Sequence, residues 1–170
     1  FVNKMDRIGA DFAQTLQMVR DRLGARPVAI QIPIGQEDRF RGVVDLVEQK
    51  SVTYADNEGA QMVVGEIPPE LREEAEHART ELIEALADVN DEIAELYLEG
   101  EDIPSELIHA ALRRATIARQ IVPFLCGSSL RNKGTQPLLD AVVNYLPAPS
   151  DIPAIEGADP VTGERVVCAS

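Results

Sequence analysis

The chain opens with Phe1-Val2-Asn3-Lys4-Met5-Asp6, in which an Asn-Lys-x-Asp box stands at the end of a predicted strand. The carboxylate of Asp6 can accept from the ring N–H and the exocyclic amino group of guanine, a donor pair that adenine lacks. The amide of Asn3 suits the far edge of the same base, and the stem of Lys4 can lie along its plane. The box therefore predicts guanine recognition. The alternative is that Asn3 and Asp6 are ordinary turn and helix-start residues.

The segments that follow the box alternate between helical and strand patterns. Apolar residues at spacings of four, three and four predict a helix over 12–23, which Gly24 ends. A strand is expected over 28–32, and a second strand, apolar on both faces, over 121–126. A last helix is expected around 138–146. Apolar strands that alternate with amphipathic helices indicate an α/β fold with a parallel, doubly wound sheet.

The stretch between the two strands has a different pattern. Short β-branched segments separated by turn residues predict a small antiparallel meander. These segments lie near 42–48, 50–55 and 61–65. Pro68-Pro69 precedes a long predicted helix that ends near Val89. Prolines are favoured at the start of a helix, because the N–H that they lack would have no partner in the first turn. Two shorter helices are expected, around 93–97 and from Pro104, so the stretch predicts a small α+β subdomain inserted beside the parallel sheet.

Gly127-Ser128-Ser129-Leu130 follows the second apolar strand and is a candidate partner for the box. Small side chains let a base approach the backbone closely, and the N–H of Ser129 can donate to the guanine carbonyl oxygen. Such a loop alone is a weak signal. Ligands of doubly wound sheets bind beyond the carboxyl ends of the strands, where both segments are expected, so we predict one guanine site. Its residues are Asn3, Lys4, Asp6, Ser128, Ser129 and Leu130.

Several longer segments closely resemble bacterial-type elongation factor G, the translocation GTPase of the ribosome. They are Asn3-Lys4-Met5-Asp6-Arg7, Gln31-Ile32-Pro33-Ile34-Gly35, Phe40-Arg41-Gly42-Val43-Val44-Asp45, Tyr97-Leu98-Glu99-Gly100-Glu101 and Asn132-Lys133-Gly134-Thr135-Gln136. The resemblance covers essentially the whole chain. It implies the C-terminal part of a P-loop GTPase-type sheet, with a subdomain inserted between the guanine loops. That insert accounts for the 122 residues that separate Asp6 from Ser128, far more than in simple GTPases.

The resemblance also divides the chain into parts. Residues 1–34 and 120–147 are expected to belong to the second half of a GTP-binding domain. Residues 35–119 are expected to form the inserted α+β subdomain. Residues 148–170 then contain a proline-rich linker and the start of a following β domain.

The phosphate-binding half of a GTPase is not found in this sequence. It contains no Gly-x-x-x-x-Gly-Lys-Ser/Thr loop, and no Asp-x-x-Gly magnesium switch stands ahead of the box, where the family has both. The resemblance implies GTP or GDP with Mg²⁺ in the intact protein. We expect no catalytic residue, no metal ligand and no bound nucleotide in this fragment. It should not hydrolyse GTP by itself, because the groups that position and stabilise the transferring phosphoryl group are missing.

The net charge of −13 is concentrated in residues 66–106. This segment carries 15 of the 29 acidic side chains and only two basic ones, so it alone accounts for the excess. Phosphates would be repelled, which argues against nucleic-acid binding there. One interpretation is a solvated helical face. The other, implied by the resemblance, is a docking surface for the ribosomal stalk protein, with Glu73, Glu76 and Glu84 as candidate contacts.

The remaining features of the sequence concern membrane binding, nucleic-acid binding, cysteine chemistry and metal binding. No apolar run is long enough to cross a bilayer, so no membrane partner is expected, and no sequence-specific nucleic acid either. Cys126 and Cys168 are expected to be reduced thiols of a cytoplasmic protein. His77 and His109 lack metal-ligand spacing and are expected to be surface or flank residues of helices.

Three possibilities stay open beside a ribosome-bound translocation factor. A peptide-release or ribosome-recycling GTPase is similar in its general plan. A non-catalytic acidic binding module is the alternative from a different class of protein. The exposed edge of the sheet could also pair with a second copy of the chain.

Overall fold

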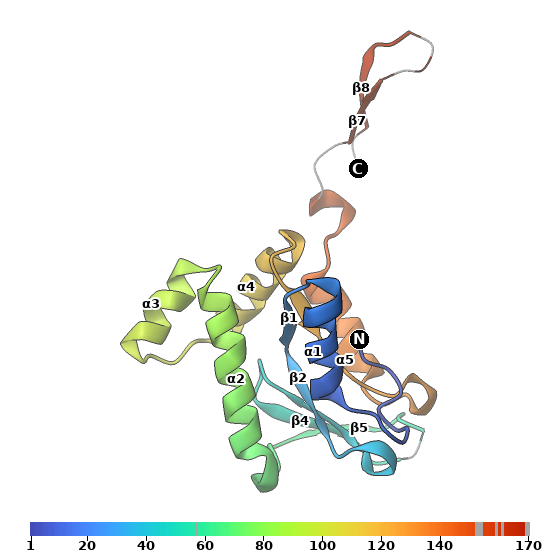
Figure 1. Ribbon diagram of the computed structural model, residues 1–170, viewed down its shortest axis with the longest axis vertical. Coiled ribbons are helices and arrows are strands. Elements are labelled where there is room, and N and C mark those ends of the chain that lie inside the picture. Colours follow the sequence, from blue (N-terminus) through green and yellow to red (C-terminus); the bar gives the residue numbers. More distant parts are fainter. Residues whose placement is uncertain (57, 152–154, 159, 161, 169–170) are drawn as a thin grey trace.

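The computed structural model describes residues 1–56, 58–151, 155–158, 160 and 162–168 of the chain. In these ranges, helices and strands build an α/β fold with a parallel sheet and a larger antiparallel sheet (Figure 1). The mixed α/β class that the sequence predicts is therefore confirmed.

The parallel sheet joins the first residues of the chain to two distant strands. β1 (Pro27–Ala29) pairs in parallel with β6 (Val122–Phe124). Just beyond β6, Cys126 forms a parallel bridge with Val2. β6 thus lies between the start of the chain and β1. The segments that follow Val2 and Cys126 leave the sheet at the same edge, which is where ligands of doubly wound sheets bind.

α1 (Phe12–Leu23) and α5 (Thr135–Tyr145) belong to this part of the fold. The side chain of Asp11 caps α1 by accepting from the N–H of Gln14 at 2.8 Å. Gly24, with a φ of 58°, ends the helix in the left-handed conformation. Both ends of the helix predicted over 12–23 are confirmed.

The strand expected over 28–32 divides at Ile30. β1 stops just before this residue, and β2 (Gln31–Ile34) belongs to the antiparallel sheet. The N–H of Ile30 donates to the carbonyl oxygen of Phe124 at 3.2 Å, whereas its own carbonyl accepts from the N–H of Leu46 at 3.0 Å. The expectation of a single strand is wrong, because a continuous apolar run does not reveal which partner each half will pair with.

The antiparallel sheet has the strand order β2-β3-β4-β5, which confirms the predicted meander. Its other strands are β3 (Gly42–Asp45), β4 (Lys50–Tyr54) and β5 (Met62–Gly65). Neighbouring side chains of β3 enter different cores, as the two-residue period of a strand requires. Val43 joins the cluster that contains Met5 and Phe124, whereas Val44 joins the cluster beneath the helices of the insert. The inserted sheet is therefore packed directly against the parallel part of the fold.

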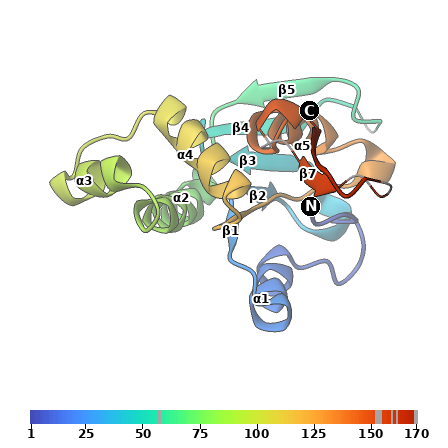
Figure 2. The same ribbon diagram turned by 90° about the horizontal axis from the view of Figure 1, so that it is seen from above.

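The helices predicted for the insert are all present. They are α2 (Arg72–Ala87), preceded by the short η2 (Pro69–Leu71), then α3 (Asp91–Glu99) and α4 (Ser105–Ile117). α2 buries Leu82 and Leu86 and exposes most of its acidic side chains. Figures 1 and 2 show α2 and α3 on the side of the molecule away from α5. The acidic helices are thus separated from the edge where Val2 and β6 end.

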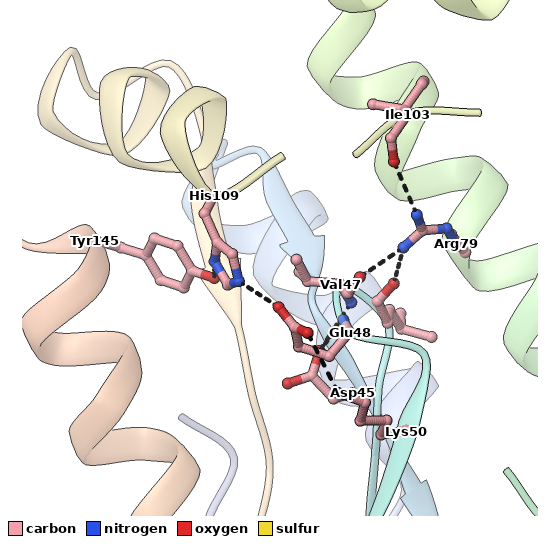
Figure 3. A network of polar contacts seen from close by, with 9 residues as sticks. Asp45, Val47, Glu48, Lys50, Arg79, Ile103, His109 and Tyr145 are labelled. Carbon is pink, nitrogen blue, oxygen red and sulfur yellow. Dashed lines mark hydrogen bonds and ion pairs between the residues drawn. The ribbon is translucent and has the colours of Figure 1, made fainter. Parts of the chain in front are cut away.

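A polar network joins the insert to α5 (Figure 3). Nδ1 of His109, on α4, lies 2.7 Å from the hydroxyl of Tyr145, and Nε2 lies 3.0 Å from Oε1 of Glu48. The hydrogen bond from His109 lowers the pKa of the Glu48 carboxyl. The sequence predicts that both histidines are surface or flank residues. His77 is exposed, whereas the side chain of His109 is two-thirds covered and both its ring nitrogens are engaged. Its partners come from other elements, so no local pattern indicates them.

The last described elements are the short η4 (Pro149–Asp151) and a hairpin of β7 (Ile155–Ala158) and β8 (Arg165–Cys168). The two strands pair antiparallel, and Figure 1 shows the hairpin extending away from the other elements. Strands are thus present where the sequence predicts the start of β structure. Residues 152–154 of the expected linker and the side chain of Cys168 lie outside the described part of the chain.

Two further observations bear on the class of protein. Within the described ranges, none of the helices has both the length and the apolar character that a membrane span requires. Cys126 is completely buried, and burial raises the pKa of its thiol to about 12. This thiol therefore packs as a small apolar side chain and has little nucleophilic character.

Candidate functional site

Backbone hydrogen bonds join the Asn-Lys-x-Asp box to the loop after β6. The N–H of Val2 donates to the carbonyl oxygen of Leu125 at 2.7 Å, and the N–H of Gly127 donates to that of Val2 at 2.9 Å. The N–H of Met5, inside the box, donates to the carbonyl oxygen of Gly127 at 3.1 Å. The two segments that the sequence predicts to share a site are thus side by side at the end of the parallel sheet.

Asn3 connects the two segments through its side chain. Its Oδ1 accepts from the N–H of Lys4 at 2.8 Å and from the N–H of Ser129 at 3.0 Å. The second donor is the one that the sequence analysis assigns to the guanine carbonyl oxygen. A base that used this N–H would have to share it with Asn3 or displace the amide. The sequence could not show this, because the contact spans 126 residues.

Lys4 has a left-handed backbone conformation with a φ of 67°. This conformation costs a residue other than glycine about 1–2 kcal/mol, so other contacts must hold it. The Asn3 side chain holds the N–H of Lys4, and the carbonyl of Lys4 accepts from the N–H of Arg7 at 3.0 Å. The side chains of Asn3 and Lys4 remain exposed. The box therefore presents both side chains outward from a fixed turn.

Asp6 is the acceptor group of the candidate site. Its side chain is 10% exposed, and its Oδ2 lies 3.4 Å from Nε of Arg131. The neighbouring hydroxyl of Ser128 lowers the pKa of the Asp6 carboxyl most strongly, and Arg131 lowers it further, against the effect of burial. Asp6 is therefore ionised at neutral pH and can only accept hydrogen bonds, as the donor pair of guanine requires.

Ser128 and Leu130 occupy contrasting positions in the loop. Ser128 is completely buried, and its hydroxyl has no partner at good hydrogen-bond geometry among the described residues. Leu130 lies in the short η3 (Ser129–Arg131) and is 83% exposed. Arg131, which the sequence analysis did not single out, lies next to Asp6. The sequence signal that could have indicated Arg131 is its position directly after the small-residue loop.

Two glycines allow the loop to close on itself. The loop closes through reciprocal backbone hydrogen bonds between Ser128 and Lys133, of 2.8 and 3.0 Å. A Cβ at Gly127 would lie 2.5 Å from the carbonyl oxygen of Lys133. A Cβ at Gly134, where φ is 81°, would lie 2.6 Å from the carbonyl oxygen of Cys126. Both contacts are shorter than a side chain tolerates, so the loop requires glycine at these positions.

The three acidic residues predicted as partner contacts lie elsewhere. Glu73, Glu76 and Glu84 are on α2, and all three are exposed. Glu84 accepts a hydrogen bond from the hydroxyl of Tyr97 at 2.8 Å and lines an open hollow of about 700 Å³ between α1, α2 and α3. These residues therefore form a surface that is separate from the loops.

The fold and the paired loops define the chain as part of a nucleotide-binding α/β domain of the GTPase type. The sequence matches the elongation factor Tu GTP binding domain over residues 1–148, so the chain belongs to this family of translational GTPases. It is also similar to the crystal structure of a protein from Thermus thermophilus, with 28% sequence identity and a TM-score of 0.75. That match covers 98% of this chain and 26% of the solved one, so the chain spans about a quarter of the solved protein's length.

Proposed function

We propose that the chain is the base-recognition half of the GTP-binding domain of an elongation factor G-like translocation GTPase. The observation that supports this most is the connection from Asn3 to Ser129, which joins two guanine loops on either side of an inserted subdomain. Such a factor acts on the ribosome in the cytoplasm and uses GTP or GDP with Mg²⁺. The phosphate and Mg²⁺ contacts would come from parts of the protein outside this chain, which alone should not hydrolyse GTP.

The sheet pairing supports a specific boundary between the GTP-binding domain and the inserted subdomain. Ile30 donates to the parallel sheet and accepts from the antiparallel sheet. We therefore place the first boundary at Ile30 instead of after residue 34. The return boundary stays near residue 120, just before β6.

The residues of the site suit the edges of a guanine base. The ionised carboxylate of Asp6 would accept from the ring N–H and the exocyclic amino group. The N–H of Ser129 would donate to the base carbonyl once the Asn3 amide turns toward the far edge of the base. The stem of Lys4 and the exposed side chain of Leu130 would pack on its faces. The support for these contacts is that the box and the loop lie side by side at the end of the parallel sheet.

The base assignment is tested by the substitution Asp6→Asn in the full-length protein. Bidentate recognition of this kind provides about 1–3 kcal/mol of discrimination. GDP affinity should therefore fall by about 5- to 150-fold, while xanthosine diphosphate should bind better, because its additional carbonyl accepts from the new amide. Titration calorimetry with both nucleotides measures the change.

Asp11→Asn is the matched control, because asparagine caps a helix as well as aspartate does. It should change neither affinity. If Asp6→Asn leaves the preference for guanine unchanged, Asp6 does not read the base and the proposed function is wrong.

We also propose that α2 is a docking surface for a basic patch on the ribosomal stalk protein. The support is the concentration of charge in residues 66–106 and the exposure of the candidate contacts. Opposite charges accelerate association, and salt weakens this effect. Reversal of all three charges should slow stalk-dependent recruitment several-fold and flatten its salt dependence. The substitutions are Glu73→Lys, Glu76→Lys and Glu84→Lys.

A control with the same change in net charge separates docking from a general charge effect. The substitutions are Glu95→Lys, Glu99→Lys and Glu101→Lys, all at exposed positions. Stopped-flow measurement of binding to ribosomes with and without the stalk compares the two triple variants. Equal slowing by both variants would contradict a specific surface on α2 and leave only the solubility interpretation.

A further inference from the structure

The β4–β5 hairpin of the insert is hydrogen-bonded to the loop that follows β6. The hydroxyl of Tyr54, the last residue of β4, accepts from the N–H of Gly134 at 2.7 Å and lies 3.1 Å from Oε1 of Gln136. The carbonyl oxygen of Gly59 accepts from Nδ2 of Asn132 at 3.1 Å and from Nε2 of Gln136 at 3.0 Å. Four hydrogen bonds therefore connect segments that lie more than 70 residues apart.

The backbones of the two segments are also in direct contact. Gly59 is buried, with a φ of 67°, and a Cβ there would lie 2.5 Å from the carbonyl oxygen of Arg131 and 2.6 Å from that of Asn132. No side chain fits between the hairpin and the loop at this point. The loop therefore rests on the hairpin without an intervening layer.

The hairpin turn is held by its own contacts. The carboxylate of Asp56 accepts from the N–H groups of Glu58, Ala60 and Gln61, at 2.7, 3.1 and 2.6 Å. These hydrogen bonds, chiefly those from Ala60 and Gln61, lower the pKa of Asp56. These contacts hold the described residues of the turn independently of the loop, so the turn can support the loop.

Tyr54 also provides a hydrogen-bond partner at the start of α5. Gly134 is the N-cap of this helix and has no side chain with which to cap it. The hydroxyl of Thr135, the next residue, is buried and has no hydrogen-bond partner among the described residues. The first N–H groups of a helix need partners from outside the helix, and the hydroxyl of Tyr54 provides one. The insert therefore fixes both the end of the loop and the start of the helix after it.

We propose that Tyr54 is a positioning residue for guanine recognition, which acts by holding the loop that carries Ser129. This inference rests on the guanine site proposed above. Reciprocal hydrogen bonds connect Ser128 to Lys133, so the orientation of the Ser129 N–H depends on where Gly134 is held. The inserted subdomain thereby takes part in reading the base carbonyl. By thermodynamic linkage, a partner that displaces the hairpin weakens guanine binding, and guanine binding strengthens the hairpin contact by the same factor.

The test compares two ligands in the full-length protein. Tyr54→Phe removes the hydroxyl and keeps the ring that packs against the core. GDP and 6-thio-GDP share every donor that Asp6 uses, but sulfur is a weak acceptor for the Ser129 N–H. GDP affinity should fall by about 3- to 10-fold, as expected for a lost hydrogen bond, whereas 6-thio-GDP affinity should change by less than about twofold. Calorimetric titration of both ligands measures the pair of changes.

Two further variants make the comparison decisive. Asn132→Gly keeps the left-handed backbone at this position, where φ is 50°, and removes one bond to the hairpin; it should show the same selectivity with a smaller loss. Tyr97→Phe makes the same chemical change on α3, far from the loop, and should leave both affinities unchanged.

The outcomes separate this inference from the function on which it rests. A loss confined to GDP supports the positioning role. An equal loss for both ligands indicates a merely structural contact and overturns it, and so does the absence of any loss. If the wild-type protein does not discriminate GDP from xanthosine diphosphate, the guanine site itself is wrong and the inference falls with it.

Discussion

Asp6 and Asp45 are two aspartates, each standing where a strand ends, and the structure treats their charges in opposite ways. At the box, the Ser128 hydroxyl and Arg131 lower the pKa of Asp6. At the end of β3, burial raises the pKa of Asp45, although its carboxylate accepts from the N–H groups of Val47 and Glu48. The loop after β6 thus stabilises the ionised form of Asp6, whereas burial in the inserted subdomain disfavours the ionised form of Asp45.

The difference shows how a binding carboxylate can be distinguished from a turn-forming one. The Ser128 hydroxyl and the Arg131 guanidinium, which favour the ionised form of Asp6, both come from a distant segment of the chain. The hydrogen bonds that Asp45 accepts come from N–H groups of its own turn, and these would bind a neutral amide oxygen equally well. A carboxylate whose charge is stabilised by groups from a distant segment is therefore a better candidate for binding than one that is merely buried.

Deformation of the loop that brings Ser128 and Arg131 to Asp6 should remove the difference between the two aspartates, and Gly134→Ala should have the largest effect. The new Cβ meets the carbonyl oxygen of Cys126 in a left-handed backbone. Strain and overpacking together should cost about 2–5 kcal/mol of stability. GDP affinity of the full-length protein should fall in parallel. Urea unfolding and calorimetry measure the two effects.

Gly24→Ala is the control for this change. Gly24 also has a positive φ, of 58°, but a Cβ there meets nothing within 4 Å. It should cost only about 1–2 kcal/mol and leave nucleotide binding intact. If the two alanine variants are equally stable, the loop can move the new Cβ away from the carbonyl oxygen of Cys126 without losing stability. The close approach at Gly134 would then not be required by the fold.

The sequence predicts the elements of the fold well where the signals are local. The spacing of apolar residues in α1, the glycine after it and the prolines before α2 act within one or two turns of helix, and these elements are found where expected. The division of the strand at Ile30 is different. The residues on either side of it are equally apolar, and only the partner strands decide to which sheet each half belongs.

The candidate site divides in the same way. The box and the loop are short motifs, so their residues could be predicted from the sequence. Tyr54 could not be assigned a role from it, because its contact with Gly134 crosses 80 residues. The sequence places Arg131 directly after the loop but does not reveal its contact with Asp6, which crosses 125 residues. The engagement of the Ser129 N–H by Asn3 was equally hidden. Local patterns thus identify the groups that a site presents, whereas the groups that orient them emerge only from the fold.

Asp45→Asn should give a small gain in the free energy of unfolding. Asn keeps the oxygen that accepts from Val47 and Glu48. Gln31 lies directly opposite in the β2–β3 register, and its buried Oε1 has no hydrogen-bond partner among the described residues. The new amide N–H can donate to this oxygen, which should add about 0.5–1.5 kcal/mol at pH 7. Loss of attraction to nearby His109 and Arg79 (Figure 3) opposes this gain without reversing it, because burial is the larger influence on Asp45.

The pH dependence of that gain identifies its cause. A carboxyl whose pKa is raised by folding destabilises the folded state only when it is ionised. The part of the gain due to charge should therefore be complete above the raised pKa of Asp45, shrink as the pH falls through it and vanish below about 3.8, its ordinary value. Asp56→Asn makes the same change at a carboxylate whose pKa is lowered, so it should destabilise at pH 7 and lose its effect in acid. Urea unfolding of both variants between pH 3 and pH 7 measures this, and a loss of stability in Asp45→Asn at pH 7 would show that the charge of Asp45 is needed after all.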